Sequence, residues 1–299
     1  MDAMTVTGPR SASQLGLVLP HEHLLIDLRN QFTEFHDAEK RRISRESVHA
    51  AHASILRRDP YAVKDNLLLD SEALAIQELA CFKTAGGSSV VDCTSIGIGR
   101  NPAGLKEIAQ QTGLNVLAGC GWYTHDTHPA WLATATPRAL ADVMIRDLDE
   151  GMDGTDIRAG VIGELGTSDP IHTRELKVLD AAAIVYRRCP KPVYVHTFPW
   201  GTHGLEALGR LEAGGVPSDR VVICHADVAL DMTYIHRLLA RGAWVEFDNF
   251  GKEFLLDYSD RPGFARGRFA SDAERVAVIL RLADEGYLSQ LLVTTDICL

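Results

Sequence analysis

The most regular feature of the chain is an alternation of short apolar runs with longer helical stretches. Eight runs rich in Val, Ile and Leu recur along the 299 residues. They are nearly continuous rather than alternating, which is typical of strands buried on both faces of a parallel sheet. The predicted strands are residues 17–19, 89–94, 115–119, 160–165, 192–197, 221–225, 244–248 and 291–295.

Helical spacing of apolar residues fills most of the intervals between these runs. The predicted helices are residues 71–84, 102–112, 173–188, 203–213, 231–240 and 272–285. Several are followed within two residues by glycine, as at Gly113, Gly214, Gly242 and Gly286, which is the usual chemistry of a helix C-terminus. Residues 30–68 are polar and break the period, so we expect a helix-rich insertion after the first strand.

Eight strand–helix units predict an α/β fold of the (β/α)₈ TIM-barrel type, as a single domain over residues 1–299. An open, doubly wound sheet is the alternative, but its dinucleotide fingerprint is missing. Gly97 and Gly99 are followed by Pro102 where the third glycine belongs, and no GxxxxGK[ST] loop occurs. The sequence stops three residues after Asp296, so the helix that would close the barrel is not present in it.

Composition narrows the class of partner. Hydrophobic residues make up 46% and charged residues 23%, which are globular proportions, and no apolar run is long enough for a membrane span. A net charge of −10 argues against nucleic acid and anionic membranes. The six cysteines form no CxxC pair and no secretion signal opens the sequence, so we expect a reduced, cytoplasmic protein with a small-molecule substrate. The sequence leaves open whether two copies of the chain form a homodimer.

Metal-binding side chains fall at the ends of the predicted strands, where TIM-barrel active sites form. His21 and His23 lie two apart on an extended segment and therefore face the same side. His196 and His225 end neighbouring strands, and Glu164 and Asp296 add carboxylates. Four imidazoles and two carboxylates match the ligands of two zinc-like ions with a position left for water. Zinc is the expected ion, with manganese or cobalt as alternatives.

Substrate contacts are harder to place from the sequence. Tyr123 follows the third strand and is a candidate pocket residue. Lys252 and Arg275, with Arg261, Arg266 and Arg268 between them, could form an anion site after the seventh strand, although a solvated loop explains the same charges.

Most of the remaining histidines have no predicted role. His125 and His128 follow the third strand and could reach the mouth of the site. His36, His49 and His52 are expected to be exposed helix residues of the insertion.

The sequence resembles the phosphotriesterase-related branch of the amidohydrolase superfamily from Gly16 to its end. The resemblance is carried by Leu19-Pro20-His21-Glu22-His23, Gly119-Cys120-Gly121-Trp122-Tyr123, Gly163-Glu164-Leu165-Gly166-Thr167, His196-Thr197, Cys224-His225-Ala226-Asp227, Phe247-Asp248-Asn249-Phe250-Gly251-Lys252 and Thr295-Asp296.

This resemblance implies a binuclear site. His21, His23 and Asp296 would hold the buried metal, and His196 and His225 the more exposed one. Many members bridge the metals with a carboxylated lysine, whereas this chain has Glu164 at that place, as in some lactonase-like members. The departure favours a lactonase or related ester hydrolase over a phosphotriesterase.

The mechanism that the resemblance implies is attack of a metal-bridging hydroxide on a lactone or ester carbonyl, with Asp296 taking up the proton. Phosphotriester hydrolysis is the second alternative and amide hydrolysis the third. A catalytically silent barrel that keeps the metals is the alternative from another class.

Overall fold

The computed structural model describes residues 2–258 and 267–299, and its centre is a parallel sheet curled into a nearly closed barrel. All eight predicted strands are present and pair in the order β12-β11-β10-β9-β8-β7-β6-β3. Their bounds are β3 Leu17–Glu22, β6 Gly87–Asp92, β7 Asn115–Cys120, β8 Val161–Gly166, β9 Val193–His196, β10 Val221–Ile223, β11 Trp244–Phe247 and β12 Leu291–Val293. The prediction of a (β/α)₈ barrel is therefore confirmed.

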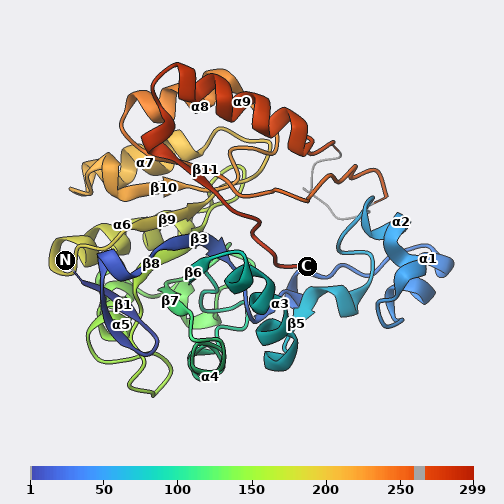
Figure 1. The fold of residues 1–299 in the computed structure, drawn as a ribbon, viewed down its shortest axis with the longest axis horizontal. Coiled ribbons are helices and arrows are strands. Elements are labelled where there is room, and N and C mark those ends of the chain that lie inside the picture. The colour runs from blue at the N-terminus through green and yellow to red at the C-terminus, as the bar shows by residue number, and fades with distance from the viewer. Residues whose placement is uncertain (1, 259–266) are drawn as a thin grey trace.

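Helices alternate with these strands and lie around the outside of the sheet (Figure 1). They are α3 Glu72–Thr84, α4 Pro102–Thr112, α5 Pro137–Asp149, α6 Thr173–Arg188, α7 Gly204–Ala213, α8 Met232–Ala240 and α9 Asp272–Asp284. Six of these helices match the predicted ones within one residue at each end. The seventh, α5, was not predicted from the spacing of apolar residues. None of the helices in the described part of the chain is long and apolar enough to cross a membrane.

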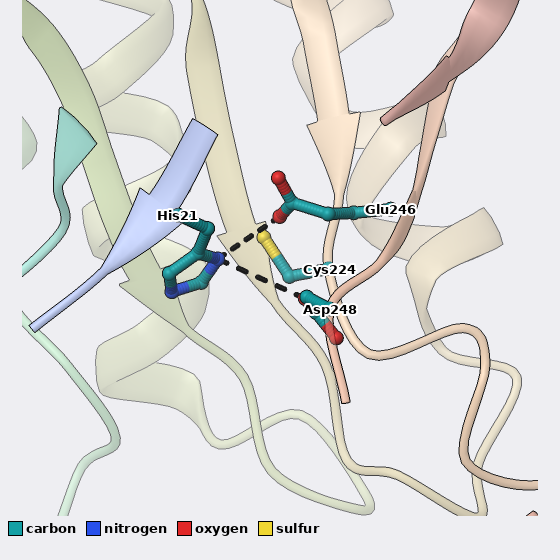
Figure 2. Close-up of side chains that lie close together, drawn as sticks. All are labelled: His21, Cys224, Glu246 and Asp248. Carbon is teal, nitrogen blue, oxygen red and sulfur yellow. Dashed lines mark hydrogen bonds and ion pairs between the residues drawn. The ribbon is translucent and has the colours of Figure 1, made fainter. Parts of the chain in front are cut away.

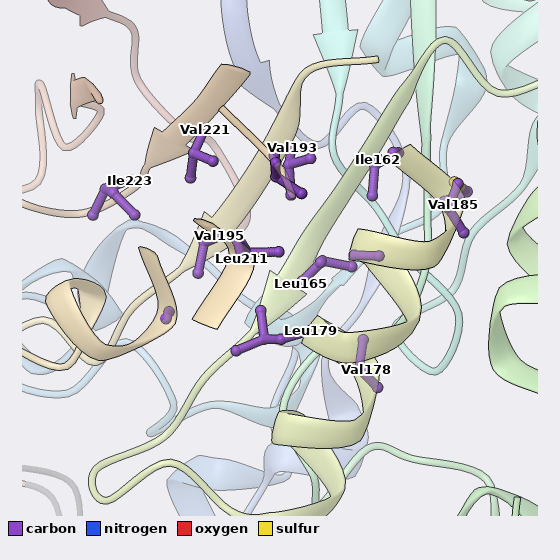
Figure 3. Close-up of a cluster of buried hydrophobic side chains, with 14 of the residues drawn as sticks. Ile162, Leu165, Val178, Leu179, Val185, Val193, Val195, Leu211, Val221 and Ile223 are labelled. Atoms are coloured by element: carbon purple, nitrogen blue, oxygen red, sulfur yellow. The ribbon is translucent and has the colours of Figure 1, made fainter. Parts of the chain in front are cut away.

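Both faces of the sheet are buried, as the continuous apolar runs predict. On the outer face, Val193 and Val195 of β9 pack with Leu179 of α6 (Figure 3). On the inner face, Val91, Leu117 and other side chains fill the barrel around Tyr194. Burial of this kind contributes roughly 25 cal/mol per Å² of apolar surface, so the barrel wall is a rigid support for the side chains at its end.

The amino end of the barrel is covered by an N-terminal hairpin of β1 (Asp2–Thr5) and β2 (Gly8–Ser11). The amide of Val6 donates to the carbonyl of Val116 at 2.8 Å, and Ala3 and Leu15 pack against the cluster inside the barrel. The barrel interior is thus packed from this end.

The predicted insertion lies between β3 and α3. It contains β4 (Ile26–Asp27), α1 (Ala38–Ser44), α2 (Ala53–Leu56), β5 (Leu68–Leu69) and short 3₁₀ turns, so its helices are shorter than the composition suggested. Figure 1 shows α1 and α2 at one end of the molecule, apart from the helices around the sheet.

Candidate active site

The two histidines at the end of β3 present their Nε2 atoms to one centre. The register of β3 against β6 shifts between Leu19 and Glu22, the stretch that contains His21, and irregularities of this kind redirect side chains. The Nδ1–H of His21 donates to Glu246 Oε2 at 2.9 Å, and that of His23 donates to Thr94 Oγ1 at 2.8 Å. These hydrogen bonds fix both rings and leave each Nε2 as the atom that can bind a cation.

Glu164 on β8 lies at the middle of the site. Its Oε1 is 3.4 Å from His23 Nε2. Its Oε2 is 3.6 Å from His21 Nε2, 3.5 Å from His196 Nδ1 and 3.6 Å from His225 Nε2. One carboxylate therefore faces all four histidines, which is the position expected of a bridging ligand.

Asp296 follows β12 and closes the cluster from the other side. Its Oδ1 lies 3.2 Å from His23 Nε2 and 3.6 Å from His21 Nε2, while Lys252 Nζ donates to Oδ2. His225 and Asp296 have φ angles of 62° and 45°. Non-glycine residues rarely adopt this left-handed conformation, and it turns both side chains into the site. All six predicted ligands thus come together.

The donor set fits divalent metal ions. Two groups of three ligand atoms each lie within 4.8 Å of one another: His21, His23 and Asp296, and Glu164, His196 and His225. In the described part of the chain, the buried atoms His21 Nε2 and Glu164 Oε2 have no hydrogen-bond partner. Buried polar atoms normally have one, so this pair is explained if each atom coordinates a cation.

A second layer of acids lies beneath the ligands, inside the barrel (Figure 2). Glu246 and Asp248 approach His21 Nδ1 at 2.9 and 3.7 Å, next to Cys224, and all of these side chains are buried. Neither acid is among the site residues predicted from the sequence. Their signal was present, because the two acids lie two apart in an otherwise apolar strand and so point into the barrel together.

A buried network also supports His225. Its Nδ1–H donates to Asp248 Oδ2 at 3.0 Å, and Asn249 links Asp248 to Asp227 through hydrogen bonds of 2.6 and 2.7 Å. Arg275 of α9 pairs with Asp227 at 2.8 Å. The Arg275 side chain is fully buried, so it supports this network, and its position does not support the prediction that it contacts substrate.

The carboxylates and histidines shift each other's pKa. Burial alone would lower the pKa of His23, but Asp296 and Glu164 outweigh it and raise that pKa to about 9. Burial is likewise outweighed at His225, where Asp248 above all raises the pKa to about 10. Burial would raise the pKa of Glu164, yet the facing histidines hold it well below its usual range. The protein without metal therefore holds protons where cations would bind.

A cavity of about 320 Å³ opens above these ligands. Tyr123 and Lys252 both line it, as predicted for substrate-binding residues, and the Tyr123 hydroxyl is 3.3 Å from His196 Nε2. Burial raises the pKa of Tyr123 well above its usual range, so its hydroxyl stays protonated. Apolar side chains make up much of the remaining wall, among them Ile26, Leu28, Ile98, Phe198, Phe254 and Phe269.

The remaining histidines and arginines considered in the sequence lie partly at the cavity and partly away from it. His125 lines the cavity, whereas the Nε2–H of buried His128 donates to the carbonyl of Tyr123 at 2.7 Å and so supports the loop. Arg268 pairs with Glu274 on the surface. Arg261 and Arg266 lie outside the described residues. His52 is buried, which corrects the prediction that it is exposed.

A barrel with this ligand set at the carboxyl ends of its strands defines the class: a metal-dependent hydrolase. The chain belongs to the phosphotriesterase family, whose model matches residues 1–299. It is 35% identical over 300 residues to the N-acetyltaurine hydrolase of Danio rerio, covering 98% of this chain and 83% of that protein.

Two solved structures extend the comparison. A resiniferatoxin-binding protein from Rhodobacter sphaeroides superimposes with a TM-score of 0.94 at 36% identity, covering 99% of this chain and 81% of that one. A mutant phosphotriesterase-like lactonase from Deinococcus radiodurans gives a TM-score of 0.74 at 29% identity, covering 98% and 81%.

Proposed function

We propose that the chain hydrolyses a carboxylic acid derivative at a centre of two divalent metals, with zinc as the expected ion and manganese or cobalt as alternatives. The observation that carries this proposal is the central position of Glu164, whose Oε1 faces His23 while its Oε2 faces His21, His196 and His225. Six donor side chains exceed the four ligands that one zinc ion usually takes, so the set accommodates two ions.

The reaction divides between the ions and the side chains. Two such ions lower the pKa of water toward about 7 and polarise a carbonyl oxygen, which is the chemistry they would supply here. Asp296 accepts the proton of the attacking water and passes it to the leaving group. Lys252 keeps Asp296 ionised, and the protonated hydroxyl of Tyr123 donates a hydrogen bond to the substrate oxygen.

Lactones and related esters are the first substrate class that we propose. Glu164 stands where many relatives carry a modified lysine, and the apolar walls suit a neutral acyl group. N-acyl amides are the second candidate, favoured by the N-acetyltaurine hydrolases among the curated relatives. Phosphotriesters remain a third, and a barrel that binds metal without turnover is the alternative from another class.

The test pairs metal analysis with a substrate panel. Purified chain is stripped, reloaded with Zn²⁺, Mn²⁺ or Co²⁺, and assayed on aliphatic and acyl-homoserine lactones, N-acetyltaurine and a paraoxon-type triester. We expect two ions per chain in the barrel and lactone or amide turnover that is lost in His21→Ala and Asp296→Asn. His203→Gln, which changes a surface histidine, is the control. No turnover of any substrate by the fully loaded protein would contradict the proposal.

A further inference from the structure

A second group of metal-binding side chains lies on the insertion, away from the barrel. Glu46 follows α1, His49 directly precedes the 3₁₀ turn Ala50–His52, and His52 is the last residue of that turn, which leads into α2. We propose that Glu46, His49 and His52, called the insertion triad below, bind one divalent cation of the zinc type that holds this segment in place.

The geometry of the insertion triad matches metal coordination. Glu46 Oε2 is 3.1 Å from His52 Nε2 and 3.6 Å from His49 Nε2. In a tetrahedral site with bonds of 2.0–2.1 Å, neighbouring ligand atoms are about 3.4 Å apart. The two measured distances lie on either side of that value, so an ion fits between the three atoms with only small movements of the side chains.

The side chains of the triad direct two imidazole nitrogens at one carboxylate oxygen. The two imidazole rings lie 3.8 Å apart and both direct Nε2 to the same carboxylate oxygen, while Arg42 occupies the other oxygen. The His52 side chain is 5% exposed, and its buried Nδ1 has no partner in the described part of the chain. Its ring is therefore held at the polar end by Nε2 alone, the atom that faces the ion.

Access and protonation also suit metal binding. His49 is 54% exposed, so an ion can enter and keep a water ligand at its open position. Partial burial would raise the pKa of Glu46, but the hydrogen bond from His52 and the charge of Arg42 outweigh it and lower that pKa. The carboxylate is ionised at neutral pH.

The triad is connected to the wall of the active-site cavity by a short stretch of chain. The carbonyl of Arg57 accepts from the amide of Leu255 at 2.9 Å, and Arg58 makes a two-pronged ion pair with Asp257 at 2.7 and 3.0 Å. Pro60 and Tyr61, directly beyond, line the cavity. An ion at the triad would fix the start of this stretch and so reduce the motion of one cavity wall.

The experiment counts Zn²⁺ on the full chain after stripping and reloading. The variants are His49→Gln and Glu46→Gln, with His36→Gln as a matched control, because His36 is an exposed histidine of the same insertion outside the triad. Both triad variants should bind one ion fewer than the control, or bind that ion at least tenfold more weakly. Chelation of that ion from the wild type should speed amide hydrogen exchange over residues 46–58.

The barrel ions are separated from this one by a double variant, His21→Ala with His196→Ala. Adding His49→Gln to this variant should lower its Zn²⁺ content by one ion, whatever the barrel retains. Circular dichroism confirms that the variants fold, which the exposure of His49 makes the expected outcome. Equal Zn²⁺ content and affinity in wild type, Glu46→Gln and His49→Gln would overturn the proposal, while turnover tests the barrel site independently.

Discussion

At the scale of single residues, the site depends on which atom of each side chain is left free. His21 and His23 use Nδ1 for hydrogen bonds to Glu246 and Thr94, so Nε2 is the atom left to bind a cation. The ligands could be predicted because they occupy strand ends in the sequence. For Glu246, the spacing to Asp248 indicates a side chain that points into the barrel, but its contact with His21, 225 positions away, is not contained in any local pattern.

The pairing of Lys252 with Asp296 predicts a change in pH profile. Burial raises the pKa of Asp296, but the charge of Lys252 and the facing histidines lower it by more. In Lys252→Met that pKa should rise, so Asp296 becomes protonated at a higher pH. The acidic limb of the kcat/KM profile should therefore shift to higher pH. Lys252→Arg should leave the limb near its original place. An unchanged limb in Lys252→Met would show that Asp296 does not depend on this charge.

The raised pKa values of His23 and His225, about 9 and about 10, predict that metal binding displaces protons. Below these values the metal-free site holds protons, so affinity for Zn²⁺ should increase as the pH rises from about 6 toward 9, and protons should be released. Titration calorimetry in buffers of different ionisation enthalpy measures that release. Heats that do not depend on the buffer would exclude it.

At the scale of elements, strands and helices were predicted well because both faces of each strand are buried and glycines end the helices. Helix α5 was not singled out, although Thr136 caps it and Pro137 stands at its first turn. The insertion was predicted only as polar and helix-rich, because its short segments are fixed by contacts with distant loops, such as that of Arg58 with Asp257.

Helix α9 supports the site through one buried charge. Removing Arg275 would leave Asp227 buried without its cation, so Arg275→Ala should lower the free energy of unfolding by about 3–5 kcal/mol. Arg281→Ala, on the exposed side of the same helix, removes an i,i+4 pair with Glu285 and should lower the free energy of unfolding far less. Urea unfolding of both variants measures the difference, and equal losses would contradict the assigned role of Arg275.

At the scale of the whole molecule, the barrel is closed by a side chain where the backbone ladder is incomplete. Glu22 of β3 accepts hydrogen bonds from Thr294, from the amide and hydroxyl of Thr295 at 3.0 and 2.7 Å, and from the amide of Ile297 at 2.9 Å. Because these residues flank Asp296, the same carboxylate that joins β12 to β3 also positions a metal ligand.

Loss of this closure should affect stability and metal binding together. Glu22→Ala removes a charged acceptor, worth about 1.5–3 kcal/mol for each hydrogen bond, and should lower both the free energy of unfolding and the affinity for the ion at His21 and His23. Glu22→Gln, which keeps the shape and part of the bonding, should lie between that variant and the wild type. Urea unfolding measures the stability and Zn²⁺ titration measures the affinity. A Glu22→Ala protein that is less stable but binds Zn²⁺ with unchanged affinity would show that Glu22 does not position the metal ligand Asp296.

The N-terminal hairpin has a kinetic consequence. Because it covers the amino end of a barrel already filled by side chains, the cavity at the carboxyl end serves as both entrance and exit. A reaction product must leave by the path along which the next substrate arrives. The two therefore compete for the same space, and the acid released by hydrolysis should act as a competitive inhibitor.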